Sequence, residues 1–129
     1  MYQKLIATLL LFVAMSATAQ ISPQKSSQGG VTVAVTPIEV GAGVSEWKFK
    51  VVLDTHSQDL SDDLVKTSVL LDSTGRETKP LTWEGAGPGG HHREGVLKFT
   101  AVEPLPEVVE LRIARPGEPA ARTFSWRLK

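Results

Sequence analysis

The fold is decided by residues 46–64, Glu-Trp-Lys-Phe-Lys-Val-Val-Leu-Asp-Thr-His-Ser-Gln-Asp-Leu-Ser-Asp-Asp-Leu. In the first half of this stretch, every second residue is hydrophobic, and these residues share one face: Trp47, Phe49, Val51 and Leu53. A period of two with aromatic and β-branched residues is typical of a half-buried strand. Two aromatic residues on the same face predict a central strand of the core. The second half is a polar loop that carries a histidine and three aspartates.

The same alternation recurs along the rest of the chain. It predicts further strands at residues 31–40, 65–71, 78–84, 96–101, 107–114 and 121–128. Turn signals rich in Gly, Pro, Asp and Ser separate these segments, as at residues 72–75 and 115–119. Seven short strands without a helical period predict an all-β fold, a seven-stranded antiparallel immunoglobulin-like sandwich. A small closed β-barrel is the alternative.

The N-terminus has the parts of a secretory signal peptide. Lys4 precedes an apolar run over residues 5–15, and Ala17-Thr18-Ala19 offers a cleavage site. The run is shorter than the roughly 20 residues that span a bilayer. We therefore expect a signal peptide at residues 1–19, a flexible leader at 20–30 and a β-sandwich domain at 31–129. The protein is expected to be exported, periplasmic or secreted, without membrane insertion after cleavage.

Composition narrows the classes of partner. Fourteen Lys and Arg residues balance fourteen Asp and Glu residues, so the formal net charge is zero. Near-neutrality without a run of one sign argues against nucleic acid or an anionic membrane surface as a partner. Cysteine is absent, which excludes disulfides and thiolate metal ligands.

All three histidines of the chain lie in two loops, at His56 and at His91-His92. If neighbouring strands run antiparallel, both loops fall at the same end of a sandwich. Imidazole nitrogens with carboxylates suit copper or zinc, so we expect a metal site at this end. Its candidate ligands are His56, His91, His92, Asp54, Asp59 and Glu94. Their spacing matches no standard zinc motif, and the alternative is that these histidines are solvated loop residues.

No pattern of an enzyme is present. His56 and Ser57 are sequence neighbours and cannot readily form a Ser–His pair, and no Gly-x-Ser-x-Gly elbow exists. Residues 85–90 satisfy the dinucleotide pattern G-x-G-x-x-G, but a strand follows them where the pattern requires a helix. We therefore expect no enzyme, no catalytic residues and no nucleotide cofactor.

Several elements resemble a group of small exported bacterial β-sandwich domains of unassigned function. They are Leu-Asp-Thr-His-Ser-Gln-Asp-Leu at residues 53–60, Gly-Gly-His-His at 89–92 and Phe-Ser-Trp at 124–126. The resemblance covers nearly the whole chain from Val31. It implies a site at the Thr-His and Gly-Gly-His-His elements, and it implies neither a substrate nor a mechanism.

Together these patterns predict an exported, non-enzymatic β-sandwich that binds copper or zinc through the histidines of two loops. The alternative is a metal-free interaction module that binds a protein or cell-envelope partner.

Overall fold

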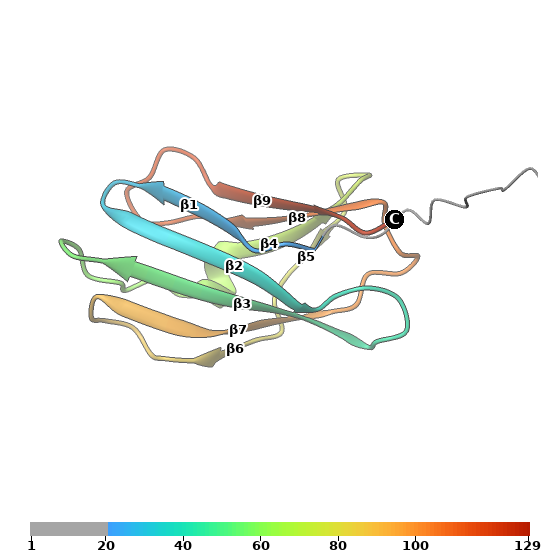
Figure 1. Cartoon of the computed structure of the whole chain (residues 1–129), viewed down its shortest axis with the longest axis horizontal. Coiled ribbons are helices and arrows are strands. Elements are labelled where there is room, and N and C mark those ends of the chain that lie inside the picture. Colours follow the sequence, from blue (N-terminus) through green and yellow to red (C-terminus); the bar gives the residue numbers. More distant parts are fainter. Residues whose placement is uncertain (1–20) are drawn as a thin grey trace, which may run out of the picture.

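The centre of the fold is strand β3, Glu46–Thr55, in a computed structural model that describes residues 21–129. β3 lies between β2 (Val31–Glu39) and β7 (His92–Thr100) and is antiparallel to both (Figure 1). Its alternating hydrophobic side chains are fully buried: Trp47, Phe49, Val51 and Leu53. The expected central strand is therefore confirmed.

Nine strands in the described residues form two antiparallel sheets. The five-stranded sheet has the order β1-β2-β3-β7-β6, and the four-stranded sheet has the order β5-β4-β8-β9. Besides β2, β3 and β7, the elements are β1 (Gln24–Gln28), α1 (Leu64–Thr67), β4 (Ser68–Asp72), β5 (Glu77–Thr78), β6 (Thr82–Gly85), β8 (Val108–Ile113) and β9 (Arg122–Arg127).

The core lies between the two sheets. The Phe49 ring from β3 meets the Trp126 ring from β9 at a centroid distance of 5.4 Å, which joins one sheet to the other. Within the larger sheet, Phe49 and Phe99 form an edge-to-face pair at 5.7 Å. Each such pair adds about 0.5–1.5 kcal/mol beyond the burial of its area. The all-β, two-sheet expectation is confirmed, and the closed barrel is wrong because the sheets stay separate across the described residues.

The expected count of seven strands is wrong, and the first reason is β1. Residues 20–30 were expected to be a flexible leader, yet Gln24–Gln28 pair with Val31–Val35 of β2. Gly29 and Gly30 both have positive φ, which makes the tight two-residue turn between these strands possible. Because β1 is polar on both faces, its sequence shows no alternation that would reveal it.

The second reason is that the strand expected at residues 78–84 is divided. Its beginning, β5, belongs to the four-stranded sheet, and its end, β6, belongs to the five-stranded sheet. Pro80 lies between them. Proline has no N–H to donate to a ladder, so a continuous strand through this position is disfavoured.

The single turn of α1 was also not expected. Asp63 caps it, since its side chain accepts a hydrogen bond from the backbone N–H of Lys66. Within residues 21–129, no helix has the length and apolar character needed to cross a bilayer. The expected signal peptide at residues 1–19 lies outside the described residues.

Candidate functional site

Both histidine loops lie at the same end of the sandwich, at the left of Figure 1, as the antiparallel argument predicted. Asp54 near the end of β3 is opposite His92 at the start of β7. The backbone N–H of Thr55 donates to the carbonyl of His91 at 2.9 Å. We call this region, formed by residues 28–31, 55–63, 86–92 and 115–122, the histidine end.

An open pocket of about 410 Å³ lies at the histidine end. All three histidines line it, together with Asp54 and three small residues: Gly30, Thr32 and Thr55. The Thr55 hydroxyl donates to the carbonyl of Gly30 at 2.8 Å, which joins the two walls of the pocket. The side chains of His56 and His91 are exposed and form no hydrogen bond within residues 21–129, so both are available to a ligand.

His92 differs from the other two histidines because both of its ring nitrogens meet carboxylates. Nδ1 is hydrogen-bonded to Asp54, and Nε2 lies 3.4 Å from Glu94. Glu94 in turn forms an ion pair with Lys50 at 2.7 Å. The bond to Asp54, followed by that to Glu94, raises the pKa of His92 above its ordinary value. His92 is therefore stabilised as a cation, whereas a metal ligand must be neutral imidazole.

The expected metal ligands are only partly brought together. His56, His91, His92 and Asp54 share the pocket, whereas Asp59 and Glu94 do not line it. In the part of the chain that the structure describes, no three His, Asp or Glu side chains converge as a group that could hold one ion. The six-residue ligand set stays a prediction.

A buried network of charged residues lies beneath this surface, and the sequence reasoning missed it. Arg115, directly after β8, forms a two-pronged ion pair with Asp62 of the 55–63 loop, at 2.9 and 3.1 Å. The Arg115 side chain is 4% exposed and that of Asp62 is fully buried. Arg115 also forms an ion pair with Glu118, with 3.3 Å between Nη1 and Oε2. The pair between Arg115 and Asp62 connects the turn between β8 and β9 to the loop that follows β3.

Arg122 at the start of β9 extends the network to the N-terminal hairpin. Its guanidinium donates two hydrogen bonds to the carboxylate of Glu118, at 2.8 and 2.9 Å. It also donates to the backbone carbonyls of Ser26, Gln28 and Val31. The bond from Arg122 lowers the pKa of Glu118 more than burial raises it, so this carboxylate stays ionised.

Arg93 of β7 completes the network on the other side. It donates to the carbonyl of Asp62 at 2.6 Å and to that of Ala86 at 3.2 Å. Its guanidinium lies 5.7 Å from the centroid of the Trp83 ring. Gly95 makes room for that ring, because a Cβ there would come within 2.6 Å of the indole. Arg93 thus ties the two histidine loops to each other.

The signal that could have found this network is the phase of the strands. Arg93 falls on the same face of β7 as Leu97 and Phe99, and Arg122 falls on the same face of β9 as Phe124 and Trp126. An arginine in the inward phase of a strand must find partners, since a buried unpaired charge is very costly.

Comparisons with known proteins add little on function. The structure is similar to the crystal structure of a DUF4426 family protein from Pseudomonas aeruginosa, with a TM-score of 0.49 and 18% sequence identity over 79% of this chain and 91% of that chain. No protein-family model and no curated protein matches the sequence.

We predict that Asp62→Ala lowers the free energy of unfolding by about 3–5 kcal/mol, because it leaves Arg115 buried without its main partner. Urea denaturation measures this loss. Arg112→Ala is the matched control: it removes an exposed pair with Glu110 and should change stability by about 0–1 kcal/mol. The double variant Asp62→Leu/Arg115→Met should lose less than the sum of its single variants. A loss no larger for Asp62→Ala than for Arg112→Ala would contradict the role of the pair.

We also predict that His92 titrates above 6.5 in the folded protein and that Asp54→Asn lowers its pKa. A raised histidine pKa stabilises the fold below 6.5, and this contribution disappears as pH rises through the folded value. NMR titration of the His92 ring protons measures the shift. Asp63→Asn, a change in the cap of α1, should leave His92 unchanged. Equal His92 titrations in the two variants would show that Asp54 does not hold the proton.

Proposed function

We propose that the protein is an exported, non-enzymatic, immunoglobulin-like β-sandwich that binds a ligand at its histidine end. The observation that carries this proposal is the pocket lined by His56 and His91 on loops held by buried arginines. A site whose loops are already held in place loses little conformational entropy when a ligand binds.

The strand order supports the immunoglobulin-like part of the proposal. The order β2-β3-β7-β6 matches A-B-E-D of that fold, and β4-β8-β9 matches C-F-G. In this assignment β5 is an additional strand beside C, and β1 is an additional strand beside A. The two additions account for the difference between seven and nine strands.

Three features favour a binding role over catalysis. Among the described residues, no Ser or Thr hydroxyl is hydrogen-bonded to an imidazole, so no activated nucleophile supports a hydrolytic mechanism. The Thr55 hydroxyl already donates its hydrogen bond to the carbonyl of Gly30. Both ring nitrogens of His92 are hydrogen-bonded to carboxylates, so neither is free to act as a general base.

The first candidate ligand is copper or zinc, favoured by the two unbonded imidazoles in one pocket. His56 and His91 are the expected protein ligands, while the carboxylates of Asp54 and Glu94 favour the protonated form of His92. Because the pocket is open to solvent, water or a ligand from a partner can complete the coordination shell of the metal.

We predict that copper(II) binds the metal-free protein at micromolar concentration and more tightly than zinc. His56→Ala and His91→Ala should each weaken binding at least about tenfold. His92→Gln is the matched control, with affinity expected within about threefold of the original protein. Affinity should fall as the solution becomes more acidic, because protons compete for the imidazole lone pairs. Calorimetric titration measures all of these quantities.

The second candidate is a metal-free interaction module that binds a protein or cell-envelope partner through the same loops. The buried arginine network favours it, because such a network holds a fixed surface whether or not a metal is bound. If neither metal binds at micromolar concentration, or if His56→Ala binds as tightly as the original protein, the metal site does not exist and this candidate replaces it.

Export rests on the N-terminal sequence, and we predict that cleavage after Ala19 makes Gln20 the first residue of the mature chain. Intact-mass measurement of the protein from a bacterial periplasmic extract or culture medium tests this. Retention of residues 1–19 in the purified protein would contradict cleavage.

A further inference from the structure

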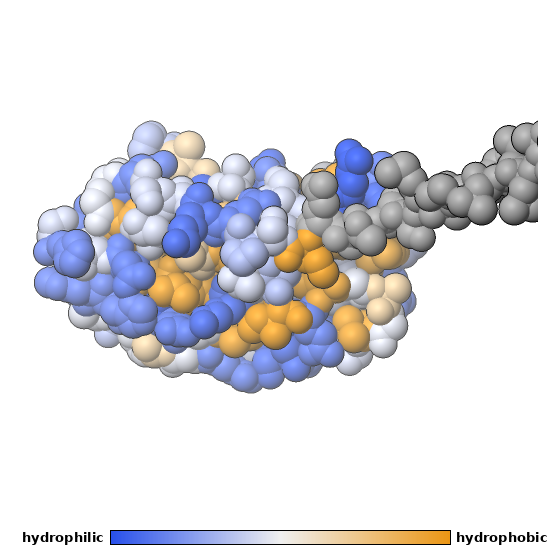
Figure 2. Space-filling model, viewed as in Figure 1, coloured by the Kyte–Doolittle hydropathy of each residue, from blue (hydrophilic) through white to orange (hydrophobic). Residues whose placement is uncertain are grey.

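The end of the sandwich opposite the histidines carries an apolar surface that the proposed function does not use. Within residues 21–129, the exposed large hydrophobic side chains are those of Ile21, Ile38 and Leu81, and the first two line the same hollow. In Figure 2 the larger hydrophobic patches of the visible face lie toward this end, while the histidine end is mainly hydrophilic. Exposed apolar side chains that gather in one place are typical of interaction sites.

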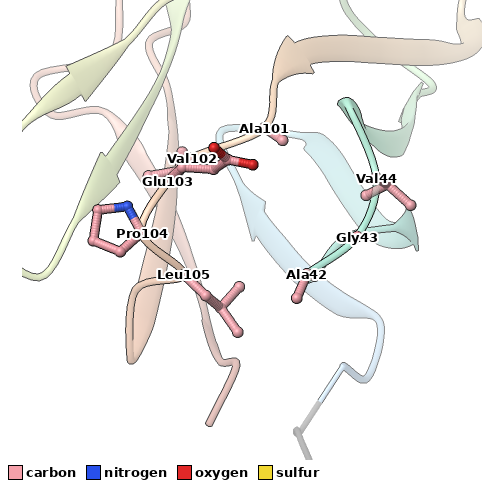
Figure 3. A pocket seen from close by; sticks show the side chains of 9 residues that line it. Ala42, Gly43, Val44, Ala101, Val102, Glu103, Pro104 and Leu105 are labelled. Atoms are coloured by element: carbon pink, nitrogen blue, oxygen red, sulfur yellow. The ribbon is translucent and has the colours of Figure 1, made fainter.

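Two neighbouring hollows form this surface, which we call the apolar end. The first, of about 190 Å³, lies between Ile21 and residues 37–44. The second, of about 240 Å³, lies between residues 41–44 and residues 101–105. Figure 3 shows Leu105 and Ala42 on opposite sides of the second hollow, with the carboxylate of Glu103 at its rim. The two hollows share a wall, because both are lined by Gly41, Ala42 and Val44.

The walls of the apolar end are already fixed. The indole N–H of buried Trp47 donates to the carbonyl of Gly41 at 2.9 Å. The backbone N–H of Ala101 donates to the carbonyl of Ser45 at 3.0 Å, which ties the 101–105 segment to the 41–44 loop. The hollows are therefore formed before any partner arrives.

The charges around the apolar end select the kind of partner. Among the residues that line the two hollows, the charged ones are Glu39 and Glu103, and both are acidic. Glu39 pairs with Lys48 at 3.2 Å, whereas Glu103 forms no ion pair within residues 21–129. The unpaired carboxylate of Glu103 repels anionic lipid head groups and would bring like charges together in a contact between two copies through this surface. It attracts a basic partner.

The backbone at this end favours contact through side chains over strand addition. β1 covers β2 only as far as Val35, and beyond it Pro37 has no N–H to offer to an incoming strand. Apolar side chains of a partner can instead enter the hollows beside Ile38 and Leu105.

We propose that the apolar end is a docking surface for an extended protein segment in which apolar side chains alternate with basic ones. The apolar side chains occupy the two hollows, and the basic ones meet Glu39 and Glu103. This surface shares no residue with the histidine pocket.

The test uses fluorescein-labelled decapeptides and the purified protein, with binding measured by fluorescence anisotropy. The probe alternates Leu and Lys; one comparison peptide has Glu in place of Lys, and another has Ser in place of Leu. The protein should bind the Leu–Lys peptide and neither of the others. Ile38→Ser should weaken binding at least about tenfold. Glu39→Lys/Glu103→Lys should reverse the preference, so that the Leu–Glu peptide binds instead.

Leu81→Ser is the matched control, because Leu81 is as exposed as Ile38 but lies between β5 and β6. It should bind the Leu–Lys peptide as the original protein does. The proposal is overturned if the Leu–Lys peptide does not bind, or if Ile38→Ser or the charge-reversed variant binds it unchanged. It is also overturned if Ile38 is needed instead for self-association in sedimentation, or for binding to phosphatidylcholine vesicles.

Discussion

The buried ion pair between Arg115 and Asp62 is the constraint on which the histidine end depends. Its charges lie away from water, so neither loop can move without leaving a charge unpaired in a medium of low dielectric constant. The carbonyl of Asp62 also accepts from Arg93, and Glu118 bridges Arg115 to Arg122. Through these shared partners, four segments distant in sequence are held as one unit.

The two ends of the sandwich are stabilised by different interactions, and they expose different kinds of side chain. Buried ion pairs stabilise the histidine end, and imidazoles and carboxylates are exposed on its surface. Backbone hydrogen bonds and the bond from the Trp47 indole stabilise the apolar end. Aliphatic side chains are exposed there, with Glu39 and Glu103 at the edge. The ten residues of β3 separate them by roughly 33 Å at the usual rise per residue. At that distance a ligand at one end does not touch a ligand at the other.

The strands that were predicted well are those with one buried face. β3 was recognised, as was β7 from Val96 onward, because a strand with its inward face in the core must alternate hydrophobic and polar residues. The first residues of β7, His92–Glu94, were assigned to the preceding loop. β1 was missed because it is polar throughout and is held by the glycine turn and by Arg122. The same local argument placed the histidines at one end, since strand direction reverses at each antiparallel connection.

The sequence by itself determined which side chains point inward, because alternation follows from the geometry of each strand and requires no knowledge of its neighbours. The strand predicted at residues 121–128 puts Arg122 inward, and the alternation of the strand at 96–101, continued back to residue 93, puts Arg93 inward. Only the tertiary structure decided what meets them. Asp62 lies 53 residues from Arg115, and the match between them arises when two sheets bring a loop and a turn together. The raised pKa of His92 arises in the same way, since its partner Asp54 lies on the neighbouring strand.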